Sequence, residues 1–295
     1  TNTKELNKAE RVMEVLKEGK GRKVCNTKNP CLRPLHDPHE GALRVVGLMS
    51  GKGSNLQKIL EWGETLRKKR GRAVYQLVAI FSDTFDSSAC EIGKNFDIPV
   101  VSRDVKGFYA YRGKPRSDLK VREEFDRQTV NALSPFEARV AVYAGYMSIA
   151  TQPLVEAFLG VNVHPADLSI EVEGKRKYTG SHAVRDAIAA GETSLCSTTH
   201  MVESIVDEGR ILMISSPLPI APEWSLKGPQ SGRTIAAVAQ DCQERLKMAG
   251  DWIIFPRTLQ YIAEGRYALD EDGNLFFDGQ KIPHGLRLDP ASLSD

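Results

Sequence analysis

Two polar residues follow an apolar run near the middle of this sequence and could take part in proton transfer. Residues 160–163 read as a strand that continues into Asn162-Val163-His164-Pro165, and alternation along a strand puts Asn162 and His164 on one face. A carboxamide can donate a hydrogen bond to a developing oxyanion, and an imidazole exchanges a proton near neutral pH. The pair is a candidate for acyl transfer, although a satisfied buried histidine beside a turn asparagine explains these four residues more simply.

A second histidine and an aspartate occur further along the chain. His200 ends a predicted strand over residues 194–200, and Asp207 follows in a turn that also contains Gly209. An aspartate within reach of a histidine orients the ring and favours its charged form, whereas alone Asp207 is most simply a turn residue. The occurrence of Asn162, His164 and Asp207 together is what favours a catalytic interpretation.

A glycine- and serine-rich loop at residues 50–57 (SGKGSNLQ) lies between a predicted strand and a predicted helix. The unpaired N–H groups and partial positive charge of a helix N-terminus suit a phosphate or carboxylate, and glycine lets the backbone approach closely. The loop matches neither the dinucleotide pattern GxGxxG nor the pattern GxxxxGK[ST]. An ordinary turn with Ser54 or Asn55 as N-cap is the equally weighted alternative.

The elements that must position these residues alternate along the chain. Near-continuous apolar runs separated by helical patterns predict an α/β domain with a mainly parallel sheet. The turn signals Asp272-Gly273 and Asp278-Gly279 predict a hairpin within residues 266–288. We expect strands at 43–49, 75–81, 98–102, 139–144, 160–163, 194–200 and 211–214, and helices near 87–96, 118–133 and 231–264.

Composition excludes several classes of protein. The chain has 295 residues, 41% of them hydrophobic, which argues against wholesale disorder. Its net charge of +2 offers no broad field for nucleic acid or an anionic membrane, and no run approaches the roughly 20 apolar residues of a membrane span. A charged N-terminus without an apolar signal segment and five scattered cysteines predict a cytoplasmic protein with free thiols.

The first 41 residues have a different character from the rest. A short surface helix is predicted over residues 4–18, and an extended arm over 20–41, ahead of a main domain at 42–295. The arm holds Cys25, Cys31, His36 and His39, whose spacing is unusual for zinc, so an arm without metal is the favoured interpretation.

Five motifs in order make the sequence resemble one enzyme family, the phosphoribosylglycinamide formyltransferases. The likeness extends over about residues 43–283. It implies a Rossmann-like formyltransferase fold and an enzyme that makes N-formylglycinamide ribonucleotide for purine synthesis. The motifs are SGKGSNLQ (50–57), AGYM (144–147), NVHP (162–165), KYTGSHA (177–183) and THMVESIVDEG (199–209), followed by the closing segment AEGRYALDEDGNLFFDGQKIP (263–283).

The resemblance also implies roles for individual residues. Asn162, His164 and Asp207 match the catalytic trio, and Asp251 falls where the family has an acidic residue near the substrate ribose. The match to the loop that holds the ribonucleotide phosphate is at Gly53, Ser54 and Asn55. Positions that contact folate are matched by Arg122, Met147, Ser148, Ile149, Ala150, Glu203, Ser204, Ile205 and Val206.

The implied reaction is formyl transfer from 10-formyltetrahydrofolate, the co-substrate, to the amine of glycinamide ribonucleotide. In it Asn162 and His164 stabilise the tetrahedral oxyanion, and His164, supported by Asp207, assists proton transfer to the leaving folate nitrogen. The resemblance implies no metal, no nucleic acid or membrane partner, and a monomer or homodimer.

This chain also departs from the family pattern. Residues 166–176 (ADLSIEVEGKR) are longer and more acidic than the family's short connection beside the catalytic pair, which leaves the amine substrate open. Ser148 stands in place of the usual Arg, and Asp251 in place of the usual Glu. The alternatives are a formyltetrahydrofolate hydrolase, a formyltransferase for another amine, and a non-catalytic protein that binds folate and phosphate.

Overall fold

The computed structural model describes residues 31–220 and 234–289, and the chain divides into two compact units. Unit 1 comprises residues 1–161 and 259–283, and unit 2 comprises 162–258 and 284–295. The helix predicted at 4–18 and Cys25 lie outside the described residues.

The core of unit 1 is a parallel set of strands in the order β5-β2-β3-β4. Their bounds are β2 Leu43–Met49, β3 Tyr75–Ser82, β4 Val100–Ser102 and β5 Val140–Tyr143. Six of the seven residues of β2 are buried, as expected for a strand covered on both faces. The predicted alternation of strands and helices is therefore confirmed in this unit.

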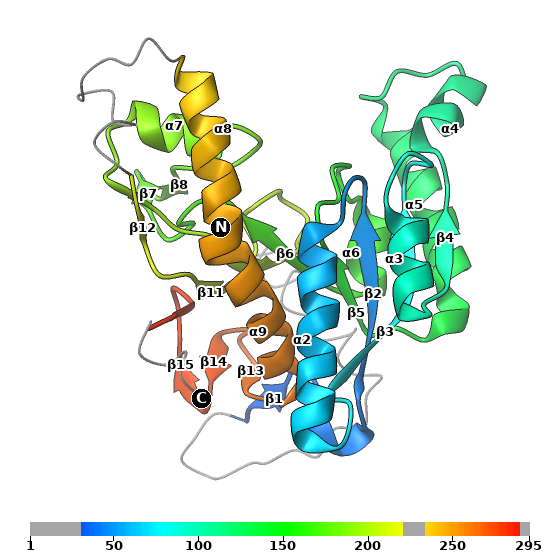
Figure 1. Cartoon of the computed structure of the whole chain (residues 1–295), viewed down its shortest axis with the longest axis horizontal. Coiled ribbons are helices and arrows are strands. Elements are labelled where there is room, and N and C mark those ends of the chain that lie inside the picture. The colour runs from blue at the N-terminus through cyan, green and yellow to red at the C-terminus, as the bar shows by residue number, and fades with distance from the viewer. Residues whose placement is uncertain (1–30, 221–233, 290–295) are drawn as a thin grey trace. The chain divides into compact units, whose positions relative to one another are not determined.

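Helices of unit 1 pack around these strands (Figure 1). Capping explains where several begin, since the Asp104 and Asp118 side chains accept hydrogen bonds from the first-turn N–H groups of α4 and α5. The helices are α2 Ser54–Arg70, α3 Ala89–Phe96, α4 Val105–Tyr111, α5 Leu119–Leu133 and α6 Gln152–Ala157, with short 3-10 turns at Pro38–Glu40 and Ser134–Phe136.

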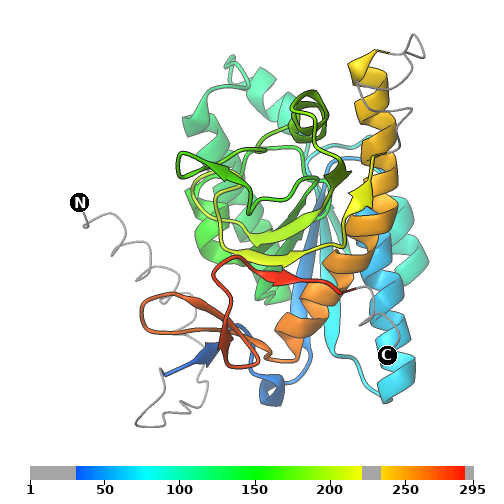
Figure 2. The ribbon, with the colours of Figure 1, turned by 90° about the vertical axis from the view of Figure 1, so that its left-hand side faces the viewer.

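The C-terminal hairpin is confirmed as part of a small antiparallel sheet in unit 1. Strand β13 (Tyr267–Leu269) pairs with β14 (Leu275–Phe277), which pairs with β15 (Gln280–Lys281). The other edge of β13 pairs with β1 (Arg33–Pro34), and Figure 2 shows β1 beside this orange and red hairpin. Within the predicted arm, Leu35 is fully buried and His36 Nε2 contacts the Gly41 carbonyl at 3.0 Å.

Unit 2 is built on the strands that follow β6 (Leu159–His164), which runs across the boundary between the units. Strand β10 (Thr198–Met201) pairs antiparallel with β11 (Ile211–Ile214), and β11 pairs parallel with β16 (Leu286–Arg287). The predicted strand 194–200 is interrupted, because β9 (Ser194–Leu195) pairs instead with β12 (Leu218–Pro219). A short hairpin, β7 (Glu171–Val172) and β8 (Lys175–Arg176), occupies the long connection after β6.

The helices of unit 2 bury an apolar face between them. Residues of α7 (Ala183–Ala189) and α8 (Ile235–Leu246) share one hydrophobic cluster with Ala166 and Tyr178. The single helix predicted over 231–264 is divided, because a π-helical segment, Lys247–Asp251, separates α8 from α9 (Trp252–Ala263). A π-helical turn re-aims side chains locally and is common near functional sites.

No helix in the described part of the chain is long and apolar enough to cross a membrane. Among the described cysteines, Cys90 and Cys196 carry free thiols.

Candidate functional site

His164 is the last residue of β6, and its ring is held at both nitrogens. The side chain is buried, with 5% of its surface exposed. Nδ1 lies 3.5 Å from Oδ2 of Asp207, and Nε2 lies 2.8 Å from the backbone carbonyl oxygen of Tyr178. Both partners are hydrogen-bond acceptors, so each ring nitrogen faces a group that favours a proton on it.

His200 lies on the opposite side of the same carboxylate. Its Nε2 is 3.5 Å from Oδ1 of Asp207 and 3.3 Å from Nδ2 of Asn162, while its Nδ1 is 2.9 Å from the Met201 carbonyl. The ladder between β10 and β11 changes register between Thr199 and His200, as at a β-bulge, a feature that re-aims side chains. Asp207 is thus bracketed by two imidazoles, with the Asn162 amide beside one of them.

Asp207 is placed by an uncommon backbone conformation. Its φ of 57° lies in the left-handed region that non-glycine residues rarely adopt. Gly180 N–H donates to Oδ2 of Asp207 at 2.8 Å, and the Arg176 guanidinium donates to the carbonyls of Asp207 and Gly209. Both the side chain and the backbone of the aspartate are therefore fixed by the segment that follows β7.

The electrostatics of the cluster favour an ionised Asp207 and a neutral His164. Burial acts to raise the pKa of Asp207, but the hydrogen bond from His200, the attraction of the His164 ring when that ring is protonated, and the Gly180 N–H together lower it to about 2. Burial lowers the pKa of His164 and outweighs the opposing effects of Asp207 and the Tyr178 carbonyl. A neutral imidazole near a carboxylate can accept a proton and then be stabilised as imidazolium.

The predicted phosphate loop of unit 1 opens α2 with a glycine. Gly53, the N-cap, has a φ of 67° and no side chain with which to cap the first turn, and that turn contains no acidic residue. A Cβ at Gly53 would lie 2.6 Å from Cδ1 of Ile92 and 2.7 Å from Cε of Met49. The loop is therefore restricted to glycine here, and an anion would meet the positive end of a 17-residue helix.

The family of this chain is shown by a match over most of its length. The profile of the family described as "Formyl transferase" matches residues 43–228, more than half of the chain. This chain belongs to the formyl transferase family. The match confirms the resemblance derived from the motif series and identifies the protein as a formyltransferase.

The names of two curated relatives of this formyltransferase refer to a formyl transfer and to purine biosynthesis. The phosphoribosylglycinamide formyltransferase of Escherichia coli is 25% identical over 243 residues, which are 82% of this chain and 96% of that protein. The human trifunctional purine biosynthetic protein adenosine-3 is 28% identical over 234 residues, which are 79% of this chain and 19% of that protein.

Solved structures of two formyltransferases confirm the Rossmann-like α/β fold. The phosphoribosylglycinamide formyltransferase of Coxiella burnetii superposes with a TM-score of 0.60 at 24% identity, over 84% of this chain and 100% of that one. Glycinamide ribonucleotide transformylase 1 of Symbiobacterium toebii gives a TM-score of 0.58 at 22% identity, over 80% of this chain and 94% of that one.

Of the site residues predicted for this formyltransferase, the trio lies together in unit 2. Asn162 and His164 both contact the His200–Asp207 group, as their alternation on one strand predicts. His200, which the sequence places at a strand end ahead of Asp207, is not among the predicted site residues. A histidine seven residues before the aspartate, at the end of the neighbouring strand, was the available signal.

The positions in unit 1 predicted to contact folate have contrasting environments. Met147 is 80% exposed, and its backbone N–H donates to Oγ of Ser50 at 2.9 Å, which joins this segment to the phosphate loop. Ile149 is also exposed, and Ser148 Oγ donates to Asp83. The remaining member, Ala150, is half-buried.

Arg122, the other predicted folate contact in unit 1, is buried and already paired. Its guanidinium lies 2.7 Å from Oδ1 of Asp126 and donates to the Tyr146 hydroxyl at 2.5 Å. Asp126 in turn accepts both the N–H and the hydroxyl of Thr151. A contact between Arg122 and folate stays a prediction.

The predicted folate loop of unit 2 leads directly to Asp207. Ser204, Ile205 and Val206 are exposed, while Glu203 accepts a hydrogen bond from Arg210 at 2.6 Å across the base of the loop. An exposed apolar pair at the tip of a loop tied at its base is suited to contact an apolar ligand.

Asp251, the predicted ribose contact, is the last residue of the π-helical segment. It is buried, and Oδ1 accepts the Ser197 hydroxyl at 2.6 Å. A Cβ at the neighbouring Gly250 would lie 2.4 Å from Oγ of Ser197, so this turn packs closely on the strand region of unit 2. The ribose contact stays a prediction.

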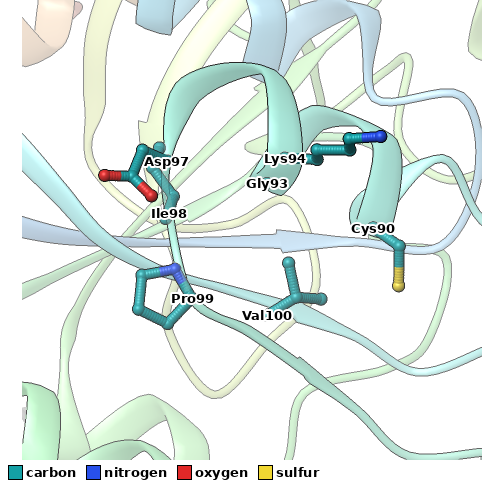
Figure 3. A pocket seen from close by; sticks show the side chains of 7 residues that line it. All are labelled: Cys90, Gly93, Lys94, Asp97, Ile98, Pro99 and Val100. Atoms are coloured by element: carbon teal, nitrogen blue, oxygen red, sulfur yellow. The ribbon is translucent and has the colours of Figure 1, made fainter.

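A surface pocket of about 500 Å³ in unit 1 lies apart from the residues predicted for the site. Figure 3 shows the Lys94 amine and the Asp97 carboxylate pointing away from each other around an aliphatic wall. The pocket therefore brings together no acid–base pair comparable to His164 and Asp207. Its lining residues are Cys90, Gly93, Lys94, Asp97, Ile98, Pro99 and Val100.

Proposed function

We propose that this formyltransferase moves the formyl group of 10-formyltetrahydrofolate to the amine of glycinamide ribonucleotide, in purine synthesis. The names of the relatives from Escherichia coli and human support the amine and the pathway. The family match supports formyl transfer as the reaction class.

The observation that carries the proposal is the position of Asp207. Its two carboxylate oxygens lie 3.5 Å from Nδ1 of His164 and 3.5 Å from Nε2 of His200. A carboxylate that orients a neutral imidazole is the arrangement needed for general acid–base catalysis. Binding of folate and phosphate alone would not require this buried group.

The proposed reaction begins when the substrate amine attacks the formyl carbon and the carbonyl electrons move to oxygen. The Asn162 amide donates a hydrogen bond to this oxyanion, and the His164 ring stabilises it once the ring has accepted a proton. The neutral His164 ring accepts the proton that the attacking nitrogen loses, and the resulting imidazolium gives this proton to the folate nitrogen as the bond from carbon to that nitrogen breaks. The products are the formylated amine and tetrahydrofolate.

His164 must free one ring nitrogen to exchange this proton. The carboxylate of Asp207 stabilises the charged ring, so the contact that we expect to be exchanged is the one to the Tyr178 carbonyl. Substrate binding would therefore move the ring or the segment that carries Tyr178.

Phosphate recognition is assigned to the loop that opens α2. Gly53, Ser54 and Asn55 are the proposed contacts, because the Gly53 N-cap leaves the first turn without a capping side chain and without an acidic neighbour. Asp251 is the proposed partner of the ribose, and the exposed Met147, Ile149, Ile205 and Val206 are proposed contacts of the folate.

The test is the absorbance change on formation of tetrahydrofolate from the 10-formyl donor, with and without glycinamide ribonucleotide. Turnover that requires the amine supports the proposal, and mass spectrometry of the product should show one added formyl group. Loss of the donor without the amine would identify a hydrolase. Turnover with a different amine only would overturn the proposed substrate. Binding of both ligands without turnover would overturn the proposed reaction.

A further inference from the structure

The hairpin in the long connection after β6 carries one side chain that reaches the turn of Asp207. Arg176 is the last residue of β8, and 11% of its side-chain surface is exposed. Its sequence distance from that turn is about thirty residues, so no local pattern links them. The guanidinium nevertheless makes its hydrogen bonds and its ion pair with residues of that turn.

The guanidinium spans the backbone of the turn. One terminal nitrogen, Nη1, donates to the carbonyl oxygen of Asp207, and Nη2 donates to the carbonyl oxygen of Gly209 at 2.8 Å. Nε lies 3.9 Å from Oε2 of Glu208, the residue between them. Three consecutive residues of the turn are thus held by one planar, rigid fork of donors.

These contacts matter because the backbone of the turn adopts an uncommon conformation. Asp207 has a φ of 57°, in the left-handed region that favours glycine and that other residues adopt much less often. A Cβ at Gly209 would lie 1.8 Å from the Met201 carbonyl oxygen, so the turn also passes close to the end of β10. A strained conformation persists only where its surroundings determine it.

The hairpin that presents Arg176 is itself anchored within unit 2. Leu168 N–H donates to Oγ1 of Thr198 at 3.2 Å, and the same hydroxyl donates to the Ala166 carbonyl at 2.6 Å. Arg287 donates to Asp167 at 2.9 Å. The base of the hairpin is therefore tied to the strands of the site.

Segment 176–180 contacts the catalytic pair at two further points. The Tyr178 carbonyl contacts Nε2 of His164, and Gly180 N–H donates to Oδ2 of Asp207. Arg176 is the only side chain among these contacts, since the other two use the backbone. A substitution at Arg176 is consequently the change that tests the segment directly.

We propose that Arg176 is a positioning residue, which holds the Asp207 turn so that the carboxylate faces both His164 and His200. The inference rests on the proposed function and deepens it. It gives the departure from the family pattern at residues 166–176 a role, because the inserted hairpin supplies the arginine.

The kinetic test compares Arg176→Ala and Arg176→Lys with the control Lys175→Ala. Lys175 is exposed in the same strand, so its replacement removes one positive charge without touching the turn. We expect Arg176→Ala to lower kcat by about 10- to 100-fold, the scale of a misplaced catalytic group, with KM for both substrates within about threefold. A lysine offers no planar fork, so Arg176→Lys should recover only part of kcat.

Chemical rescue provides a readout that a general loss of stability would not give. Millimolar guanidinium chloride should raise kcat of Arg176→Ala, and sodium chloride at the same concentration should not. Thermal unfolding of each variant shows whether it is folded during the assay. Unchanged kcat in a folded Arg176→Ala, or a similar loss in Lys175→Ala, would overturn the proposal.

A measurement independent of turnover separates this proposal from the proposed function. NMR titration of histidine rings labelled at Cε1, assigned with His164→Ala and His200→Ala, reports the surroundings of both rings. Arg176→Ala should shift both resonances and change the pH titration of His164, while Lys175→Ala should leave both resonances in place. Ring signals of Arg176→Ala that match the wild type would overturn the positioning role, whether or not the wild type transfers formyl groups.

Discussion

The backbone carbonyl of Tyr178 lies 2.8 Å from Nε2 of His164, on the side of the ring opposite Asp207. The imidazole is therefore clamped between a carbonyl and a carboxylate. A ring held in this way has a fixed orientation, and its proton transfer to a substrate requires exchange of one of the two contacts.

Replacement of His164 by alanine should abolish most of the turnover and leave substrate affinity nearly intact. A positioned acid–base group contributes about 10²- to 10⁴-fold to a rate, so we expect kcat to fall by that factor with little change in KM. Steady-state kinetics with both substrates check this. Wild-type turnover in the variant would exclude His164 from the mechanism.

Burial of His164 should also make stability depend on pH just below neutrality. Its pKa is lowered in the folded chain, so the unfolded chain binds the proton first as the pH falls below the ordinary value of 6.5. The free energy of unfolding should therefore drop between pH 7.5 and 5.5, and drop less in His164→Gln. Urea unfolding at the two pH values measures this drop in the wild type and in His164→Gln. The same drop in both proteins would contradict the expectation.

Asp207 should stabilise the fold in a separate, more acidic range. Its pKa of about 2, against an ordinary 3.8, corresponds to about 2 kcal/mol that is present above pH 4 and lost as the pH falls towards 2. The difference in unfolding free energy between wild type and Asp207→Asn should shrink to about half between pH 7 and pH 3. A difference that is the same at both pH values would argue against the ionised carboxylate as its source.

Alanine at Gly53 should damage both stability and phosphate recognition. The left-handed backbone at this position is expected to cost about 1–2 kcal/mol, the ends of the Met49 and Ile92 side chains must shift to admit the Cβ, and KM for the phosphorylated substrate should rise. Gly51→Ala is the matched control, since a Cβ there meets nothing within 4 Å and its stability should stay within about 0.5 kcal/mol. Equal unfolding free energies for the two variants would show that the loop tolerates a side chain at Gly53.

Ser197→Ala should destabilise unit 2 through Asp251. The buried Oδ1 of Asp251 would lose the Ser197 hydroxyl, and the loss of one intramolecular hydrogen bond costs about 0.5–1.5 kcal/mol. Chemical unfolding measures this cost. Ser169→Ala, which alters a half-buried serine on the surface of the same unit, should have a smaller effect.

The elements around the site were predictable because their signals are local. Apolar runs gave β2, β3, β5 and β11 nearly to the residue, and the Asp-Gly turns gave the hairpin at the C-terminal end of unit 1. Helical periodicity did not predict the division of the long helix. The π-helical segment at this point packs closely on Ser197, a residue far away in the sequence.

The sequence by itself determined the chemical types and their places at strand ends: an amide and an imidazole on one face of β6, and a carboxylate in a turn after β10. Only the tertiary structure decided their partners, namely the Tyr178 carbonyl on His164, His200 on the far side of Asp207, and Arg176 on the Asp207 turn. Strand periodicity is a property of neighbouring residues and is visible in the sequence. A backbone carbonyl is the same in every residue, so its choice as a partner leaves no mark on the sequence and is fixed only when the chain folds.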